Sequence, residues 1–230
     1  MDTRYVPSDL SVVILTYNKP QRLPSLLSLL PQGLEVVVAD DGTLPSLSEL
    51  LPPRVRLYTH VHDGNRASTC RNEGAKLTTR KKILFLDDDV TPHGLCLAAH
   101  SLALEMYDMS LGLLPREKWR PSTDDRTTFY IHEDQALWNW CWSGNLAIRR
   151  DVFFGLEGFD ADTFNGTADS PGHGFEDIDF GRRCFINKRS MCLNRFALAH
   201  HPSAHTSENP SEAVLRNERK YREKWGEVAG

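Results

Sequence analysis

Short apolar runs alternate with amphipathic segments along the first half of the chain. Apolar runs bounded by turn residues predict buried strands. These predicted strands are 10–16, 34–39, 55–59 and 82–86. Between them, apolar residues recur at helical spacing, which predicts helices at 20–30, 46–51 and 65–77. Strands that alternate with helices are typical of an α/β protein with a doubly wound, mostly parallel sheet flanked by helices.

The second half continues this pattern with less regular spacing. Its predicted strands are 111–114, 146–148 and 191–199. Its predicted helices are 93–109, a short one from 149, one that begins at Glu176, and a charged one at 211–225. The polar stretch 115–135 has weak periodicity and predicts a long loop, which in a compact domain is usually functional or mobile. At 230 residues, we expect the chain to form a single domain over 1–230.

Two of the predicted strands end in acidic residues. Asp87, Asp88 and Asp89 follow one of them, and Asp40 and Asp41 follow another. The carboxyl ends of parallel strands lie along one edge of the sheet, where ligands bind. Crowded carboxylates repel one another unless a cation or hydrogen-bond donors lie among them. Helix capping and turn formation are the alternative, but three adjacent aspartates exceed what a cap requires, so the pattern favours a divalent-metal and ligand site.

A tryptophan-rich segment lies in the second half. Three of the five tryptophans fall within 138–142, and Trp142 is followed by Ser143, Gly144 and Asn145. Tryptophan is often buried in a core, but its ring also stacks on sugars, and glycine permits close approach of the backbone to a ligand. Core packing and a ligand-binding wall are equally consistent with this segment.

Glu176 and Asp177 open a predicted helix behind the glycine-rich loop 165–174. The helix dipole favours acidic residues in a first turn, which is one explanation of both. A carboxylate held at this position is also suited to act as a general base. Further on, three histidines occur within six residues and are a source of one imidazole metal ligand or a solvated loop. They are His200, His201 and His205.

Composition and charge narrow the classes of function. The net charge of −4 gives no electrostatic attraction to nucleic acid or to an acidic membrane surface. We also expect no membrane-spanning segment, because no apolar run is long enough and the N-terminus lacks a signal-peptide core. The five cysteines are odd in number and include no CxxC pair, which argues against a disulfide framework or a zinc site. We therefore expect a cytoplasmic protein.

Several of these segments together resemble the GT-A fold glycosyltransferases of the inverting family 2, including bacterial chondroitin-polymerase-type catalytic domains. The similar segments are 11–19 (SVVILTYNK), 36–43 (VVVADDGT), Asn65 with 70–74 (CRNEG), 86–89 (LDDD, similar to the DxD motif), 158–160 (GFD) and 175–183 (FEDIDFGRR). The distance from His201 to Glu208 and Asn209 is similar as well. The order and spacing of the segments make the resemblance specific, and it extends from Leu10 to about Asn209.

The resemblance implies a nucleotide-diphosphate sugar donor, with a uridine-linked sugar expected, and transfer to an acceptor hydroxyl with inversion. Donor-binding residues would be Thr16, Tyr17, Asn18, Asp40, Asp41, Asn65, Arg71, Asp87 and Asp88. Asp89 and His201 would bind Mn²⁺ or Mg²⁺, Asp177 would be the general base, and Glu176 would orient the acceptor. The donor half would cover about 8–110 and the acceptor half about 111–205, with a C-terminal helix in 206–230. Trp142, Ser143, Gly144 and Asn145 would line the acceptor side.

The main alternative is a catalytically degenerate module that binds a nucleotide sugar or a partner protein. The presence of Asp41, Asp89 and Asp177 argues against it, because a binding module needs no base. A dinucleotide dehydrogenase would require a GxGxxG loop after the first strand, which is absent. No QxxRW motif of processive synthases occurs, so we expect one sugar to be added at a time. The acceptor stays open (a glycan, a small molecule or a peptide), and a homodimer is possible through the tryptophans or the C-terminal helix.

Overall fold

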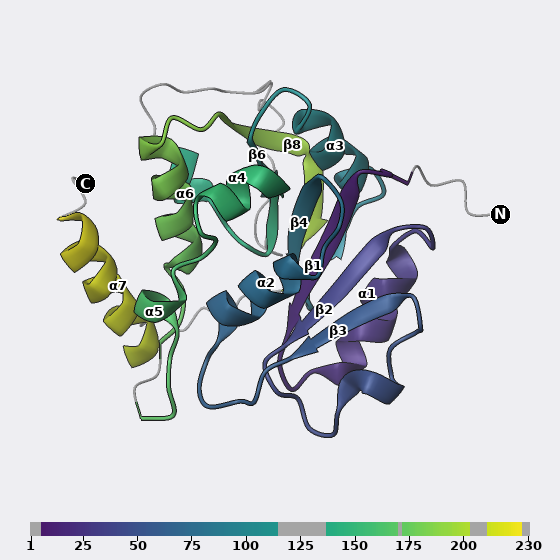
Figure 1. Cartoon of the computed structure of the whole chain (residues 1–230), viewed down its shortest axis with the longest axis horizontal. Coiled ribbons are helices and arrows are strands. Elements are labelled where there is room, and N and C mark those ends of the chain that lie inside the picture. The colour runs from purple at the N-terminus through teal and green to yellow at the C-terminus, as the bar shows by residue number, and fades with distance from the viewer. Residues whose placement is uncertain (1–5, 115–136, 170–171, 203–210, 227–230) are drawn as a thin grey trace.

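A computed structural model describes residues 6–114, 137–169, 172–202 and 211–226 (Figure 1). The predicted loop 115–135 and His205 lie outside these ranges, as do Glu208 and Asn209. In the described part of the chain, no helix is both long enough and apolar enough to cross a membrane. All five cysteines are buried and free.

A mixed eight-stranded sheet runs through the molecule in the order β3-β2-β1-β4-β7-β6-β8-β5. The strands are β1 (Leu10–Thr16), β2 (Glu35–Asp40), β3 (Val55–Thr59), β4 (Lys82–Asp87), β5 (Thr91–Pro92), β6 (Met109–Leu113), β7 (Asn145–Arg149) and β8 (Met191–His200). The first four strands along this order are parallel, as the alternating pattern predicts. The remaining part is mixed, because β7 runs antiparallel to both β4 and β6.

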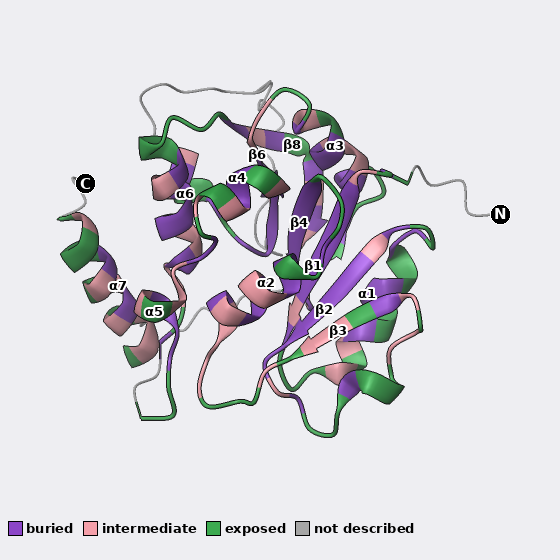
Figure 2. Cartoon of the chain, viewed as in Figure 1, coloured by how far each residue is buried: buried purple, intermediate pink, exposed green. Residues whose placement is uncertain are grey.

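Helices cover both faces of this sheet (Figure 1). They are α1 (Leu23–Leu29), α2 (Ala67–Lys76), α3 (Cys96–Ala103), α4 (Arg150–Gly155), α5 (Ala161–Phe164), α6 (Glu176–Ile186) and α7 (Glu212–Trp225), with 3₁₀ turns at Pro20–Arg22, Leu47–Glu49 and Leu137–Trp140. Successive strand residues point to opposite faces, so a strand buried on both sides is apolar throughout. In β1, Val12 and Ile14 join the core shared with α1 and α3, whereas Val13 joins the core on the α2 and α6 side. Figure 2 shows the resulting buried strands and the exposed outer faces of the helices.

The strand register brings the acidic strand ends together. Thr16 at the end of β1 lies opposite Asp40 of β2, and Leu15 lies opposite Asp87 of β4. The backbone N–H of Asp88 donates to the carbonyl of Leu15 at 3.1 Å, which keeps the chain beside β1 past the end of β4. The predicted convergence of the two acidic segments at one sheet edge is therefore present.

The predicted helix 93–109 is too long. In the structure α3 ends at Ala103, and Met109 begins strand β6. Met109 and Ser110 are buried between β7 and β8, and this pairing outweighs the local helical pattern. The short elements β5 and α5 were not predicted, since neither is long enough to show a period in the sequence.

Candidate active site

The end of β2 carries two buried aspartates with different partners. Both carboxylate oxygens of Asp40 accept from the backbone N–H of Thr43, at 3.0 and 3.1 Å, so Asp40 shapes its own loop. Asp41 Oδ2 accepts from the backbone N–H of Arg66 at 3.1 Å and lies 3.3 Å from His62 Nδ1. Burial raises the pKa of the Asp41 carboxyl, and these partners act in the opposite direction.

An aromatic pair adjoins Asp41. The rings of Tyr17 and His62 are stacked, with centroids 4.1 Å apart and planes 13° apart, and Tyr17 is 41% exposed. Asn18 follows in the left-handed region (φ 52°), and its N–H donates to Thr43 Oγ1 at 2.9 Å. An acceptor carboxylate beside a flat exposed ring suits a planar heterocycle. His62 was not identified from the sequence, because nothing local marks it as a partner of Tyr17.

Asp88 and Asp89 converge on one cationic group. Thr16 Oγ1 donates to Asp88 Oδ2 at 2.6 Å. Arg22 Nη1 donates to Asp88 Oδ1 at 2.9 Å and to Asp89 Oδ2 at 3.1 Å. The other oxygen of Asp89 lies 3.5 Å from His201 Nε2, so the predicted pair Asp89 and His201 is brought together. Arg22 was not identified from the sequence.

This cluster is compatible with a divalent metal but incomplete as a metal site. The position of Arg22 Nη1 shows that oxygens from Asp88 and Asp89 can approach a single positive centre. The described residues include no group of three or more His, Cys, Asp or Glu side chains placed to bind a metal by themselves. Mg²⁺ and related ions are commonly bound by one or two carboxylates together with substrate phosphates. The residues therefore fit a metal whose remaining ligands come from a bound diphosphate.

Arg71 connects the strand-end acids to the start of α6. Its Nη2 donates to Asp87 Oδ1 at 2.7 Å and its Nη1 donates to Glu176 Oε1 at 2.9 Å. Arg71 is only 4% exposed, and its buried Nε has no hydrogen-bond partner among the described residues. In this structure both terminal nitrogens of the guanidinium are bonded to carboxylates, and its assignment as a donor-binding residue stays a prediction.

Asp177 accepts hydrogen bonds through both of its carboxylate oxygens. Its Oδ2 accepts from the Ser143 backbone N–H at 3.1 Å and from the Ser143 hydroxyl at 3.4 Å, and its Oδ1 accepts from the N–H of Ile178 at 2.9 Å. Burial, and next the negative charge of Glu176, raises the pKa of Asp177 to about 7. A carboxyl exposed to water has a pKa near 4. Carboxyl pKa values raised well above this are found mostly at functional sites.

The tryptophan-rich segment serves both core and surface. Trp138 is buried, whereas Trp142 is 38% exposed and pairs with the exposed Trp140 at a centroid distance of 5.6 Å. Gly144 lies against the strand-end acids, because a Cβ added there would be 2.9 Å from Asp87 Oδ2. A side chain at that position would clash with the Asp87 carboxylate.

Two predicted site residues have structural partners instead. Asn145, expected on the acceptor wall, is buried, and its amide donates to the carbonyls of Leu113 and Ala197 at 3.1 and 2.8 Å. As the first residue of β7, it points its side chain toward His100 in the interior. The side-chain oxygen of Asn65 accepts from the N–H of Ala67 at 3.0 Å. This bond satisfies a free N–H group at the start of α2.

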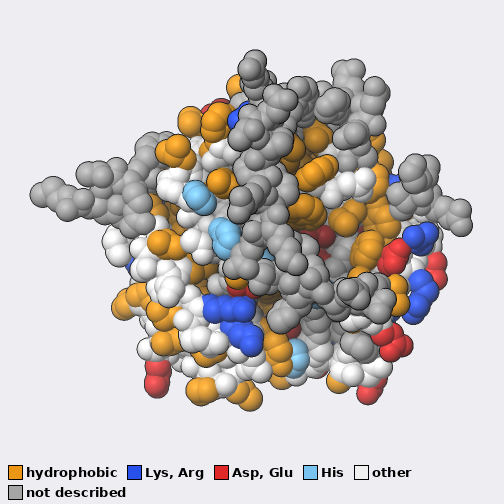
Figure 3. Space-filling model, turned by 180° about the vertical axis from the view of Figure 1, so that it is seen from behind, with side chains coloured by type: hydrophobic (Ala, Val, Ile, Leu, Met, Phe, Trp, Pro, Cys, Tyr) orange, Lys and Arg blue, Asp and Glu red, His pale blue; other side chains and the backbone are white. Residues whose placement is uncertain are grey.

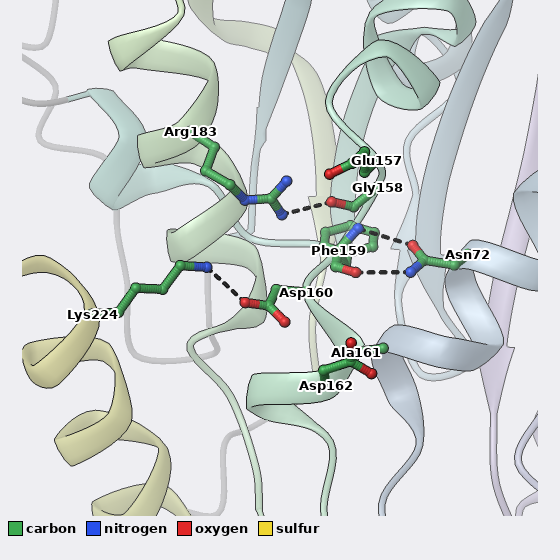
Figure 4. A pocket seen from close by; sticks show the side chains of 9 residues that line it. All are labelled: Asn72, Glu157, Gly158, Phe159, Asp160, Ala161, Asp162, Arg183 and Lys224. Atoms are coloured by element: carbon green, nitrogen blue, oxygen red, sulfur yellow. Dashed lines mark hydrogen bonds and ion pairs between the residues drawn. The ribbon is translucent and has the colours of Figure 1, made fainter.

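A separate cavity of about 450 Å³ lies between α2, the segment before α5, α6 and α7 (Figure 4). Its polar groups bond to one another. The side-chain amide of Asn72 donates to the carbonyl of Phe159 and accepts from the N–H of Phe159. Lys224 pairs with Asp160 at 2.7 Å, and Arg183 donates to the carbonyl of Gly158 at 2.6 Å. None of the strand-end acids lines it. These contacts indicate a structural junction behind the site, not a reaction centre.

The face seen from behind in Figure 3 carries histidine and lysine or arginine side chains beside a recess in which acidic side chains are visible. A mixed α/β sheet with acidic strand ends at one edge and a half-buried carboxylate beside them is the arrangement of a ligand-binding site.

Comparison with solved structures identifies the fold as GT-A. The S. aureus TarS 1–349 structure superposes with a TM-score of 0.67 at 17% identity, covering 84% of this chain and 60% of that one. A structure of GalNAc-T7 with UDP, GalNAc and Mn²⁺ superposes with a TM-score of 0.65 at 15% identity, covering 98% of this chain and 49% of that one. At these identities the likeness establishes the fold, and the fold expectation is confirmed.

The model of glycosyl transferase family 2 matches residues 11–165. The chain belongs to this family. Two curated relatives, each named validoxylamine A glucosyltransferase, are 28% identical over an alignment 239 positions long that covers 84% of this chain. They come from Streptomyces hygroscopicus subsp. limoneus and subsp. jinggangensis (strain 5008). The chain spans about half the length of these relatives, 51% and 55%.

Proposed function

We propose that this glycosyltransferase moves a glucosyl or related hexosyl group from a uridine diphosphate sugar to an acceptor hydroxyl, with inversion at the anomeric carbon. The observation that carries the proposal is the Asp87–Arg71–Glu176 bridge, which links the acidic strand ends to the helix start that bears Asp177. The names of the relatives support a glucosyl donor. A neighbouring TarS 1–349 structure in complex with UDP-GlcNAc, with a TM-score of 0.65, supports a uridine-linked one.

The donor nucleotide would bind at the ends of β1 and β2. Asp41 is an acceptor-only carboxylate when ionised, which suits the N–H of a uracil ring. Tyr17, held over His62, offers an exposed ring on which the base stacks. Asp40 supports both by fixing the loop through Thr43.

Asp89 and His201 would hold a divalent cation together with the diphosphate oxygens. A bound Mn²⁺ or Mg²⁺ would stabilise the negative charge that develops on the leaving diphosphate. The presence of Mn²⁺ in the GalNAc-T7 structure supports this part of the proposal. Thr16 and Arg22 hold the neighbouring Asp88 in place through hydrogen bonds to its two oxygens.

Asp177 would take the proton from the acceptor hydroxyl as that oxygen attacks the anomeric carbon. The two N–H groups that bond to the Asp177 carboxylate orient it, and Ser143 supplies one of them from the tryptophan-rich segment. The half-exposed Trp142 would provide an apolar surface for a sugar or cyclitol ring of the acceptor. Glu176, restrained by Arg71, would help position the same acceptor.

A donor panel tests the proposal directly. With Mn²⁺ present, a matching uridine diphosphate sugar at about 100 times its Kd is expected to stabilise the protein by about 2.7 kcal/mol, a Tm increase of about 5 to 10 °C. The same sugar on ADP or GDP serves as the control and is expected to give no shift. Slow hydrolysis of an α-linked donor, followed by proton NMR, is expected to release the β-anomer first.

Other outcomes of the panel separate the alternatives. A thermal shift without hydrolysis, and without transfer to any of a set of sugar and cyclitol acceptors, would favour the degenerate binding module. Release of the α-anomer would contradict inversion. No shift with any nucleotide sugar would overturn the proposed donor site.

The pH dependence of turnover follows from the raised pKa of Asp177. The base must be ionised to accept a proton, so kcat is expected to rise through a limb near pH 7 rather than near pH 4. The contribution of Asp177 to the stability of the fold changes in the opposite direction and decreases as pH rises. Between 3.8, the ordinary pKa of an aspartate, and about 7, the folded state retains a proton that the unfolded state has released, so this group's contribution to the free energy of unfolding falls as pH rises through that window. Initial rates over about pH 5.5 to 9 at saturating donor test the limb. A flat profile across pH 7 would contradict the assignment.

A further inference from the structure

Arg22 lies where a cation of the acidic cluster would lie. It ends the 3₁₀ turn Pro20–Arg22, directly before α1, and its side chain reaches the loop that follows β4. A single nitrogen, Nη1, contacts one oxygen of Asp88 at 2.9 Å and one oxygen of Asp89 at 3.1 Å. Two carboxylates of consecutive residues thereby share the single positive charge of one side chain from another part of the chain.

The geometry of this contact indicates that it can be exchanged. Both bonds come from one nitrogen, so the guanidinium does not form the two-pronged fork that makes arginine–carboxylate pairs strong and specific. The Arg22 side chain is 38% exposed, in contrast to 4% for Arg71, so its guanidinium keeps access to water although Asp88 is only 9% exposed, and Thr16 remains a partner of Asp88 if Arg22 leaves. Arg22 can therefore leave the carboxylates at small cost, whereas Arg71 cannot.

We propose that Arg22 is a built-in competitor of the divalent metal, which keeps the Asp88–Asp89 pair occupied until a nucleotide diphosphate arrives. A divalent ion held by Asp89 and His201 would share the Asp89 carboxylate with the Arg22 guanidinium, and two positive charges on one carboxylate would repel each other strongly at such short distance. The protein supplies too few ligands among its described residues to hold the metal alone, so metal and diphosphate together displace Arg22. The inference rests on the proposed metal site. It adds an order of binding, in which the metal binds weakly before the nucleotide and tightly together with it.

Metal binding to the nucleotide-free protein tests this role. Arg22→Gln removes the charge and keeps a polar side chain of similar reach. We expect it to raise the affinity for Mn²⁺, measured by electron paramagnetic resonance of free Mn²⁺, by about tenfold. Arg22→Lys keeps the charge and is expected to stay within about twofold of the original protein. Arg56→Gln is the matched control, because Arg56 forms a similarly exposed ion pair with Glu35 at 3.0 Å, away from the acidic cluster, and it should leave the affinity unchanged.

A second measurement uses UDP. Because Arg22 opposes the metal only until the diphosphate binds, UDP is expected to increase Mn²⁺ affinity by a larger factor in the original protein than in Arg22→Gln. Unchanged or weaker Mn²⁺ binding in Arg22→Gln would overturn the competitor role, as would failure of every variant to bind Mn²⁺. Neither result would remove the donor stabilisation expected of the original protein, so this inference and the proposed function fail separately.

Discussion

Replacement of Asp177 by asparagine is expected to lower the rate of sugar transfer by about 10² to 10⁴-fold, the usual contribution of general acid–base catalysis. Asparagine is nearly the same size as aspartate and keeps one acceptor oxygen, so it can accept from one of the two N–H groups, of Ser143 or of Ile178, which contact different oxygens of Asp177. It cannot take a proton from the acceptor. Donor affinity, measured by titration with the uridine diphosphate sugar, is expected to stay within about twofold, because Asp177 lies on the acceptor side.

Asp151 provides a matched control for this substitution. It also lies in the first turn of a helix, α4, and its Oδ1 accepts from the N–H of the next residue, Val152, at 3.0 Å. Asp177 makes the same contact with Ile178 at 2.9 Å. Asp151→Asn therefore reproduces the loss of a helix-start charge without touching the site, and it should leave kcat unchanged. Equal loss of transfer and donor binding in Asp177→Asn would show that Asp177 supports the fold rather than the reaction.

The meeting of the acidic strand ends at one sheet edge could be predicted from the sequence, because two simple rules apply to it. Buried parallel strands are continuously apolar, so β1, β2 and β4 are visible as runs that end in polar residues. Strands of one direction place their carboxyl ends together, and this rule alone puts Asp40 and Asp87 near each other. The observed register, with Thr16 opposite Asp40 and Leu15 opposite Asp87, is the outcome of those two rules.

The partners of the acidic residues could not be predicted in the same way. Arg22 reaches Asp88 across 66 positions of sequence, and Arg71 reaches Glu176 across 105. Which arginine faces which carboxylate depends on the path of loops and on helix rotation, which have no period in the sequence. His62 was missed for the same reason.

The tryptophan-rich segment shows a different limit. Its composition suits both a core and a ligand wall, and the structure divides the residues between the two. Trp138 packs against Tyr221 of α7 with centroids 6.4 Å apart, whereas Trp140 and Trp142 remain half-exposed. Asn145 begins a strand whose alternation turns its side chain inward. A motif that is read as a block hides such alternation.

Arg71→Met is expected to lower the free energy of unfolding by about 3 to 5 kcal/mol, because it removes the shared partner of two carboxylates in a water-poor site. Methionine keeps much of the side-chain volume, so the loss arises mainly from the uncompensated charges of Asp87 and Glu176. Urea unfolding with an unchanged m-value measures the effect. The matched control Arg56→Met breaks an exposed ion pair with Glu35 and is expected to cost no more than about 1 kcal/mol.

A second result is expected of the Arg71 variant if unpaired carboxylate charges cause its loss of stability. If uncompensated carboxylates cause the loss, adding Asp87→Asn and Glu176→Gln to Arg71→Met should recover part of the stability, since no buried charge then remains unpaired. Arg71 also lowers the pKa of Asp177, against the larger effect of burial, so its removal should move the limb of the pH–rate profile above 7 in any active Arg71→Met protein. A triple variant less stable than Arg71→Met alone, or an unmoved limb, would mean that Arg71 acts through packing rather than by neutralising the site.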